Sequence, residues 1–93
     1  MKTIVLNGSR MPDRDRAHDY LARMLQLPAY YGRNLDALYD CLGELGPCTL
    51  VLVNAGALRR AGGFGEKLLR TLEDAAQAVP DLRLVLDETG GGI

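Results

Sequence analysis

The sequence contains no tryptophan, one phenylalanine and one histidine, and none of its apolar runs is long. A membrane-spanning helix needs about 18 or more consecutive apolar residues, so the sequence predicts no membrane span and no membrane partner. The apolar run at residues 3–7 is also too short for the core of a signal peptide. We therefore expect a cytoplasmic protein.

Cysteine is scarce as well, with only Cys41 and Cys48 in the chain. A cytoplasmic location predicts that both thiols stay reduced, although their spacing alone leaves a disulfide between them open. A structural zinc site needs four ligands, and two cysteines with the single histidine His18 do not supply them. The sequence therefore predicts no metal site and no cofactor.

Net charge is nearly absent, at −1 over 93 residues, so bulk charge favours no class of partner. Hydrophobic residues make up 47% of the chain, which is typical of a folded protein rather than a disordered one. A chain of this length predicts a single domain over residues 1–93. Any partner must be recognised by the local distribution of charge.

Hydrophobic periodicity predicts an α/β fold in which strands and helices alternate. The strands are predicted at residues 3–7, 49–53 and 82–86, and the helices at 14–25, after an Asn34 cap, at 55–61 and at 66–79. Strands separated by helices pair in parallel, so we expect a three-stranded parallel sheet covered by three to four helices. The continuous apolar run at 49–53 is typical of a strand buried on both faces, and residues 87–93 read as a flexible tail.

Signatures of catalysis are weak. The glycine-rich residues 62–65 do not directly follow a strand and lack the ending of a phosphate-binding loop, so they read as a flexible turn. His18 falls on the polar side of the predicted helix, which favours a solvated side chain. Cys41 precedes Leu42 of an apolar stripe and reads as a half-buried structural thiol. The sequence predicts no catalytic residue, and we expect a protein that is not an enzyme.

Arginines offer a possible contact with nucleic acid. Arg10, Arg14, Arg59 and Arg60 could meet phosphate groups, but they are scattered among acids and have no aromatic platform beside them. The sequence therefore favours a partner other than nucleic acid, with salt-dependent RNA binding as the test of this hypothesis.

The helix after Asn34 carries the most informative pattern. If Leu35, Leu38 and Leu42 face the core, Asp36 and Asp40 project together, one helical turn apart, from the opposite side. Tyr30, Tyr31 and Tyr39 accompany these carboxylates, and aromatic residues beside unpaired acids suit a binding surface for a basic partner. The alternative is a solvated helix face with partly buried tyrosines, and paired carboxylates could also serve as general acid and base.

A longer motif narrows these alternatives. Residues 27–42, Leu-Pro-Ala-Tyr-Tyr-Gly-Arg-Asn-Leu-Asp-Ala-Leu-Tyr-Asp-Cys-Leu, resemble the signature segment of the barstar family of intracellular ribonuclease inhibitors. Residues 4–8 resemble the first strand and turn of that family, and the last helix and strand also align. The resemblance covers nearly the whole chain, with only residues 54–65 loosely matched.

The resemblance implies a mechanism in which the helix and the loop before it plug the active site of a ribonuclease. It implies that Asp40 takes the place of substrate phosphate, that Asp36 supports it and that Tyr30 covers the catalytic histidine. The other partner-binding positions that it implies are Gly32, Asn34, Tyr39, Gly43, Glu44 and Asp74, with Glu73 in place of Asp74 if the alignment shifts by one residue.

Several positions depart from the family pattern. Arg33 stands where the family has an acid, and it would repel a basic cleft or reach an acid on a different partner. Tyr39 replaces a tryptophan, residues 43–45 replace a segment that makes rim contacts, and Asp74 is shorter than the expected glutamate. The partner implied is a small basic secreted ribonuclease or a nuclease toxin, bound by a protein that is monomeric when free. The alternative is a barstar-like module or immunity protein whose partner is not a ribonuclease.

Overall fold

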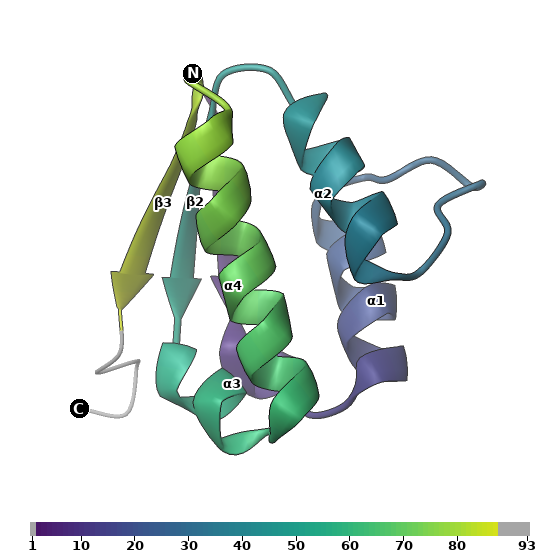
Figure 1. The fold of residues 1–93 in the computed structure, drawn as a ribbon, viewed down its shortest axis with the longest axis vertical. Coiled ribbons are helices and arrows are strands. Elements are labelled where there is room, and N and C mark those ends of the chain that lie inside the picture. Colours follow the sequence, from purple (N-terminus) through teal and green to yellow (C-terminus); the bar gives the residue numbers. More distant parts are fainter. Residues whose placement is uncertain (1, 88–93) are drawn as a thin grey trace.

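The computed structural model describes residues 2–87, and its centre is a three-stranded sheet (Figure 1). The strands are β1 (Lys2–Asn7), β2 (Cys48–Val53) and β3 (Leu82–Asp87), arranged in the order β1-β2-β3. Both pairings are parallel, with Val5 opposite Val51 and Val51 opposite Val85. The predicted parallel sheet is therefore confirmed, with β2 in the centre because it pairs on both sides.

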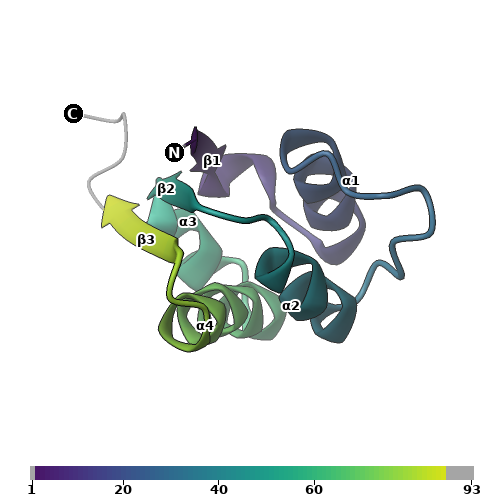
Figure 2. The same cartoon turned by 90° about the horizontal axis from the view of Figure 1, so that it is seen from above.

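Helices connect the strands and lie on one side of the sheet (Figure 2). They are α1 (Arg14–Met24), α2 (Leu35–Gly43), α3 (Ala55–Arg60) and α4 (Gly63–Ala78), and a 3-10 turn, η1 (Gly8–Arg10), precedes α1. α1, α2 and α4 run opposite to the strands, so their N-termini lie at the end of the molecule where the strands finish (Figure 1). The predicted α/β class is confirmed, with four α-helices in residues 2–87.

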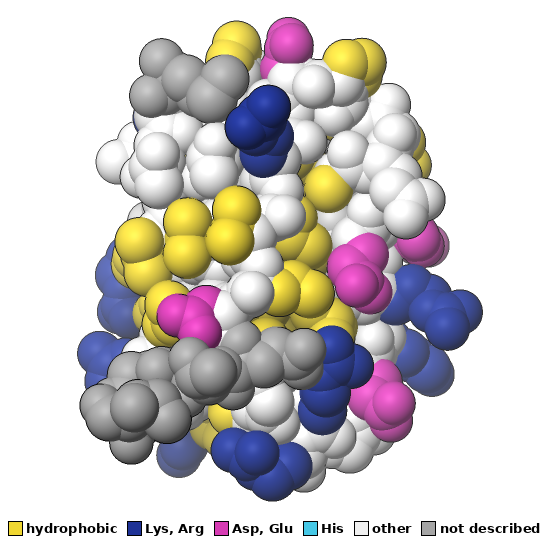
Figure 3. Space-filling view, turned by 90° about the vertical axis from the view of Figure 1, so that its left-hand side faces the viewer, with side chains coloured by type: hydrophobic (Ala, Val, Ile, Leu, Met, Phe, Trp, Pro, Cys, Tyr) yellow, Lys and Arg dark blue, Asp and Glu magenta, His cyan; other side chains and the backbone are white. Residues whose placement is uncertain are grey.

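Alternation along the strands separates a buried face from an open one. Cys48, Leu50 and Leu52 of β2 are fully buried under the helices, as period-two geometry requires for one face of a strand. On the opposite face, Val5 and Val85 are 50% and 48% exposed, and apolar side chains gather there in Figure 3. The prediction that residues 49–53 are buried on both faces is therefore wrong for the described part of the chain, because its helices all cover one face.

Polar contacts join the ends of β1 and β2. The Asn7 side chain accepts hydrogen bonds from the Ser9 amide at 3.0 Å and from Asn54 Nδ2 at 2.8 Å, and the Tyr20 hydroxyl accepts one from the Asn7 amide at 2.9 Å. Gly8 lies against this junction, where an added Cβ would stand 2.4 Å from the carbonyl oxygen of Asn54. A side chain at Gly8 would thus force the strand ends apart.

The glycine-rich segment is not a flexible turn. α4 begins at Gly63, so Phe64 and Gly65 belong to its first turn, and only Gly62, with a φ of 83°, precedes it. A Cβ at Gly65 would lie 2.0 Å from the carbonyl oxygen of Leu58 in α3. The glycine therefore allows α4 to pack closely on α3, a tertiary requirement that composition alone presents as flexibility.

His18 is buried rather than solvated, which corrects the sequence prediction. Its Nδ1 lies 2.6 Å from the Tyr31 hydroxyl, and its ring packs edge-on against Phe64. Its Nε2 has no hydrogen-bond partner among residues 2–87. Burial lowers the pKa of His18 below its ordinary value of 6.5, with further lowering by Arg33 and Arg14 that Asp15 and Asp19 partly oppose. The helix period misplaced this residue because the Tyr31 loop and α4 cover the side of α1 that the pattern leaves open.

The chain ends of the predicted elements also differ from expectation. Asp87 is the last residue of β3 and not part of a tail, and the remainder of the predicted tail, residues 88–93, lies outside the described residues.

Cys41 and Cys48 are free thiols. In residues 2–87, no helix combines the length and hydrophobicity that a membrane span requires.

Leu38 offers a direct test of the packing of α2, because its side chain is fully buried in the core. We expect Leu38→Ala to lower the free energy of unfolding by about 2–5 kcal/mol, through lost apolar burial and the cavity left behind. Chemical denaturation measures the change, with Tyr30→Ala as a control at an 86% exposed position. An unchanged midpoint for the Leu38 variant would mean that α2 is rotated differently.

Protonation of His18 should destabilise the fold. Because its pKa is lower in the folded state than in the unfolded chain, the unfolded chain binds the proton first as the pH falls. The free energy of unfolding should thus decrease from about pH 7 to about pH 5, and His18→Gln should decline less steeply. Urea denaturation at both pH values measures the slopes, and equal slopes for the two proteins would contradict this assignment.

Candidate functional site

Asn34 organises the start of α2. Its Oδ1 accepts a hydrogen bond from the Ala37 amide at 2.8 Å, which satisfies one of the free N–H groups at the helix N-terminus. Its Nδ2 donates to the Gly32 carbonyl at 3.2 Å, so the same side chain also holds the loop that enters the helix. The predicted cap is confirmed, and Asn34 ties the loop to the first turn of α2.

The rotation of α2 about its axis is set by its leucines. Leu38 and Leu42 are buried in the core between the helices, and this burial leaves Asp36 and Asp40 exposed on the opposite face. Glu44, four residues further on, is the C-cap of α2 and is also exposed. Asp36, Asp40 and Glu44 therefore form a row along one helix face, which we call the acidic surface.

The acidic surface forms no ion pair within the part of the chain that the structure describes. The carboxylates that form ion pairs with arginine there include Asp13, with Arg16, and Asp19, with Arg33, but none of the acidic surface. Exposed carboxylates four residues apart repel one another by a few tenths of a kcal/mol, and only Asp36 is close enough to the helix N-terminus to be stabilised by it. The surface therefore presents unneutralised negative charge to any partner.

The three tyrosines near this surface lie in different environments. Tyr30 is 86% exposed at the loop tip, and Tyr39 is 38% exposed on α2. Tyr31 is half-buried against His18, and burial raises the pKa of Tyr31 to about 12, so its hydroxyl stays protonated. Tyr30 and Tyr39 are thus available to a partner, whereas Tyr31 is part of the structure that supports the loop.

Cys41 behaves as a structural thiol. It is half-buried, and its pKa is raised by burial and by the neighbouring Glu44 and Asp40 carboxylates. A raised pKa keeps the thiol protonated and makes it a poor nucleophile, as the sequence predicts. Among residues 2–87, no three histidine, cysteine or acidic side chains gather where they could hold a metal ion.

Arg33 makes its contacts with α1. Its Nη1 donates to Asp19 Oδ1 at 2.5 Å, and its Nη2 donates to the backbone carbonyl of Asp15 at 3.2 Å. Sequence reasoning considered only contacts of Arg33 with a partner protein and missed this internal acid. Only Asp19 contributes a carboxylate, because the contact with Asp15 is to its backbone carbonyl, so no sequence pattern marked the pair.

The sides of α4 distinguish Asp74 from Glu73. Lys67 of α4 lines a pocket together with Asp36 of α2, so this side of α4 faces α2. Asp74 follows Lys67 by seven residues, which is two helical turns, and therefore lies on the same side. Glu73 lines a hollow with Arg59 and Arg70, to which Lys67 also contributes. Asp74 is closer than Glu73 in helical phase to Lys67, so it is the acid of α4 that lies nearer the side facing α2.

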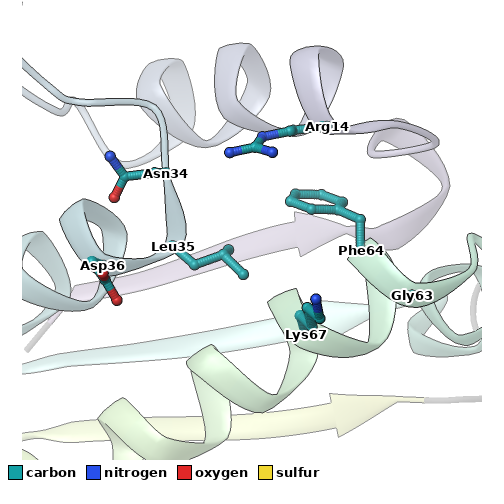
Figure 4. A pocket seen from close by; sticks show the side chains of 7 residues that line it. All are labelled: Arg14, Asn34, Leu35, Asp36, Gly63, Phe64 and Lys67. Carbon is teal, nitrogen blue, oxygen red and sulfur yellow. The ribbon is translucent and has the colours of Figure 1, made fainter.

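A pocket of about 400 Å³ adjoins the N-terminal end of the acidic surface (Figure 4). The first turns of α1, α2 and α4 surround it, and Leu35 and Phe64 supply its apolar walls. Arg14 and Lys67 bring positive charge to it, and neither is in an ion pair in the described residues. Positive charge therefore begins beside Asp36, at the N-terminal end of the acidic surface, whereas Asp40 and Glu44 lie further from it along α2.

The arginines considered for nucleic-acid binding are not gathered into one groove. Arg14 lines the pocket in Figure 4, whereas Arg10, Arg59 and Arg60 each line a different hollow. A groove for single-stranded nucleic acid combines continuous positive charge with aromatic stacking surfaces. This arrangement gives no support to the nucleic-acid hypothesis.

Comparison with known proteins agrees with the architecture of this site. The model of the family described as Barstar (barnase inhibitor) matches residues 1–88. A relative from Bacillus subtilis (strain 168), named "Putative ribonuclease inhibitor YrdF", is 37% identical over 85 residues, covering 87% of this chain and 92% of the relative. With nearly the whole chain matched by the family model, and with the parallel sheet and capped acidic helix in place, the chain belongs to the barstar family.

Proposed function

We propose that this protein inhibits a ribonuclease by covering its active site with the acidic surface and the loop before α2. The single observation that carries the proposal is the exposed, unpaired pair Asp36 and Asp40 on one face of α2. Membership of a family described as barnase inhibitors supports the same conclusion, as does the name of the Bacillus subtilis relative.

The chemistry of the proposed inhibition follows from the charge that a ribonuclease must attract. An enzyme that binds an RNA backbone presents cationic side chains to phosphate, and carboxylates on a rigid helix can occupy the same positions without offering a bond to cleave. Asp40 is the anchor in this proposal, because it lies in the middle of the acidic row with Asp36 and Glu44 on either side. Opposite potentials on the two proteins also accelerate their encounter.

Aromatic and backbone groups complete the proposed interface. Tyr30 and Tyr39 supply exposed apolar area beside the carboxylates. Gly32 and Asn34 set the path of the loop, and the exposed Gly43 lies at the end of α2, beyond Asp40. Asp74 contributes negative charge from α4.

The partner is proposed to be a small basic ribonuclease, either secreted by the same cell or delivered as a toxin. The positive charge of Arg33 was the reason to consider a partner other than a ribonuclease. That reason is weaker because Arg33 is paired with Asp19 of the same chain. The protein is proposed to act as a monomer in the cytoplasm, where Cys41 and Cys48 would remain reduced.

Replacement of the anchor tests the mechanism. We expect Asp40→Ala to raise the inhibition constant by at least about 30-fold, since leaving a buried cation without its partner typically costs about 2–5 kcal/mol. The assay is RNA cleavage by barnase and by other small basic secreted bacterial ribonucleases, with inhibitor in increasing amounts. Glu73→Ala, an exposed acid on the other side of α4, is the control and should change inhibition less than about threefold. An Asp40 variant that inhibits as well as the wild-type protein would refute the mechanism.

The contribution of α4 is tested by a matched pair of variants. Asp74→Ala should slow association with the ribonuclease by about two- to tenfold at low salt, because a rim charge acts mainly on the association rate. Glu73→Ala should leave that rate nearly unchanged. Stopped-flow association at two salt concentrations measures both, and a larger effect from Glu73 would mean that the opposite side of α4 faces the partner.

A further inference from the structure

The loop between α1 and α2, residues 25–34, is attached to the helices at successive positions. The Tyr31 hydroxyl lies 2.6 Å from His18 Nδ1, Arg33 bonds to Asp19 and Asp15, and Asn34 bonds to Ala37 and Gly32. His18, Asp15 and Asp19 all belong to α1. The end of the loop is therefore held to α1 at two side chains before Asn34 begins α2.

The contacts of Arg33 join two different kinds of acceptor. One arm of the guanidinium meets a carboxylate and the other a backbone carbonyl, a fork that a lysine side chain could not reproduce. In an α-helix the carbonyl of residue 15 points toward residue 19, so both acceptors lie within reach of one guanidinium. With Arg33 and Asp19 side chains 44% and 69% exposed, the ion pair by itself stabilises the fold only weakly. What the contact does provide is a fixed position for the end of the loop against α1.

The backbone at Arg33 supports a positioning role. Its φ of 55° lies in the left-handed region, which is unfavourable for a residue that carries a Cβ. Local preference would place glycine or asparagine there. The bonds from the Arg33 side chain to α1 offset this cost and fix the turn that leads directly into the Asn34 cap.

The same contacts decide where a positive charge is held. Arg33 lies three residues before Asp36, so a guanidinium free to move could approach the acidic surface and weaken attraction to a basic partner. Paired with Asp19, the charge is held against α1 and largely neutralised. Tyr30, the most exposed large apolar residue of the described chain, remains free at the loop tip.

From these contacts we infer that Arg33 is a positioning residue, which clamps the loop to α1 through Asp19 and Asp15. The clamp presents Tyr30 and the start of α2 to the ribonuclease in a preformed geometry. A preformed loop loses less conformational freedom on binding, which strengthens the complex without any direct contact by Arg33. The inference rests on the proposed function, and it assigns to Arg33 a specificity role that depends on its acid partner within the same chain.

A charge reversal tests the clamp, because it separates positioning from direct electrostatics. Arg33→Glu adds negative charge next to the acidic surface, so direct attraction to a basic ribonuclease predicts better inhibition. The clamp predicts the opposite, a rise of about tenfold in the inhibition constant, since Asp19 repels the introduced carboxylate and the loop is released. The swapped protein Arg33→Glu/Asp19→Arg restores the ion pair but not the bond to the Asp15 carbonyl, so its inhibition constant should fall at least about threefold below that of Arg33→Glu without reaching the wild-type value.

Further variants and a second measurement complete the design. Arg33→Lys, which keeps the charge but loses the fork, should lie between the wild-type protein and Arg33→Glu. Arg16→Glu breaks the other ion pair of α1, with Asp13, and should leave inhibition unchanged. Amide hydrogen exchange at residues 31–34 should be faster in Arg33→Glu and slower again in the swapped protein, a result that direct contact of Arg33 with a partner would not produce.

The outcomes distinguish the inference from the proposed function. Inhibition that is equal or improved in Arg33→Glu, or a swapped protein no better than the single variants, would overturn the clamp while leaving inhibition through Asp40 intact. If the wild-type protein inhibits none of the ribonucleases, the proposed function fails. Hydrogen exchange still decides the clamp in that case, since unchanged loop amides in Arg33→Glu would overturn it without any partner present.

Discussion

Burial of Leu38 and Leu42 is the constraint on which the rest of this structure depends. These side chains pack α2 into the core shared with α4 and the sheet, and their burial admits only one rotation of the helix. Given that rotation, Asp36, Asp40 and Glu44 must project into solvent. Like charges one turn apart destabilise an isolated helix. Here the burial of the leucines in the hydrophobic core forces the helix to expose them.

The parallel sheet determines what surrounds that surface. Helices that return between parallel strands start at the same end of the molecule, and the first turns of α1, α2 and α4 meet there around one pocket (Figures 1 and 4). Arg14 and Lys67 give this end a positive charge, while the acids lie further along α2 and α4. The separation of charge into two regions lets a protein of almost zero net charge present a strongly acidic face.

The loop before α2 shows how support and contact are divided among neighbouring residues. Tyr31 and Arg33 turn inward to His18, Asp19 and Asp15, whereas Tyr30 turns outward. The acidic surface by itself gives no sign of these inward contacts, because Tyr31 and Arg33 do not belong to it. The sequence motif therefore identifies the segment as a whole, but it does not show which of its residues face the protein interior and which face solvent.

The sequence by itself determined the order of strands and helices, the parallel sheet and the side of α2 that carries the acids. All three features follow from short-range periodicity. The spacing of Leu35, Leu38 and Leu42 is enough to predict which side of α2 carries the acids. Only the tertiary structure decided that His18 is buried, that Gly65 belongs to a helix packed against Leu58, and that Arg33 pairs with Asp19. Each of these depends on a neighbour brought close by the packing of separate elements, so no local pattern could reveal it.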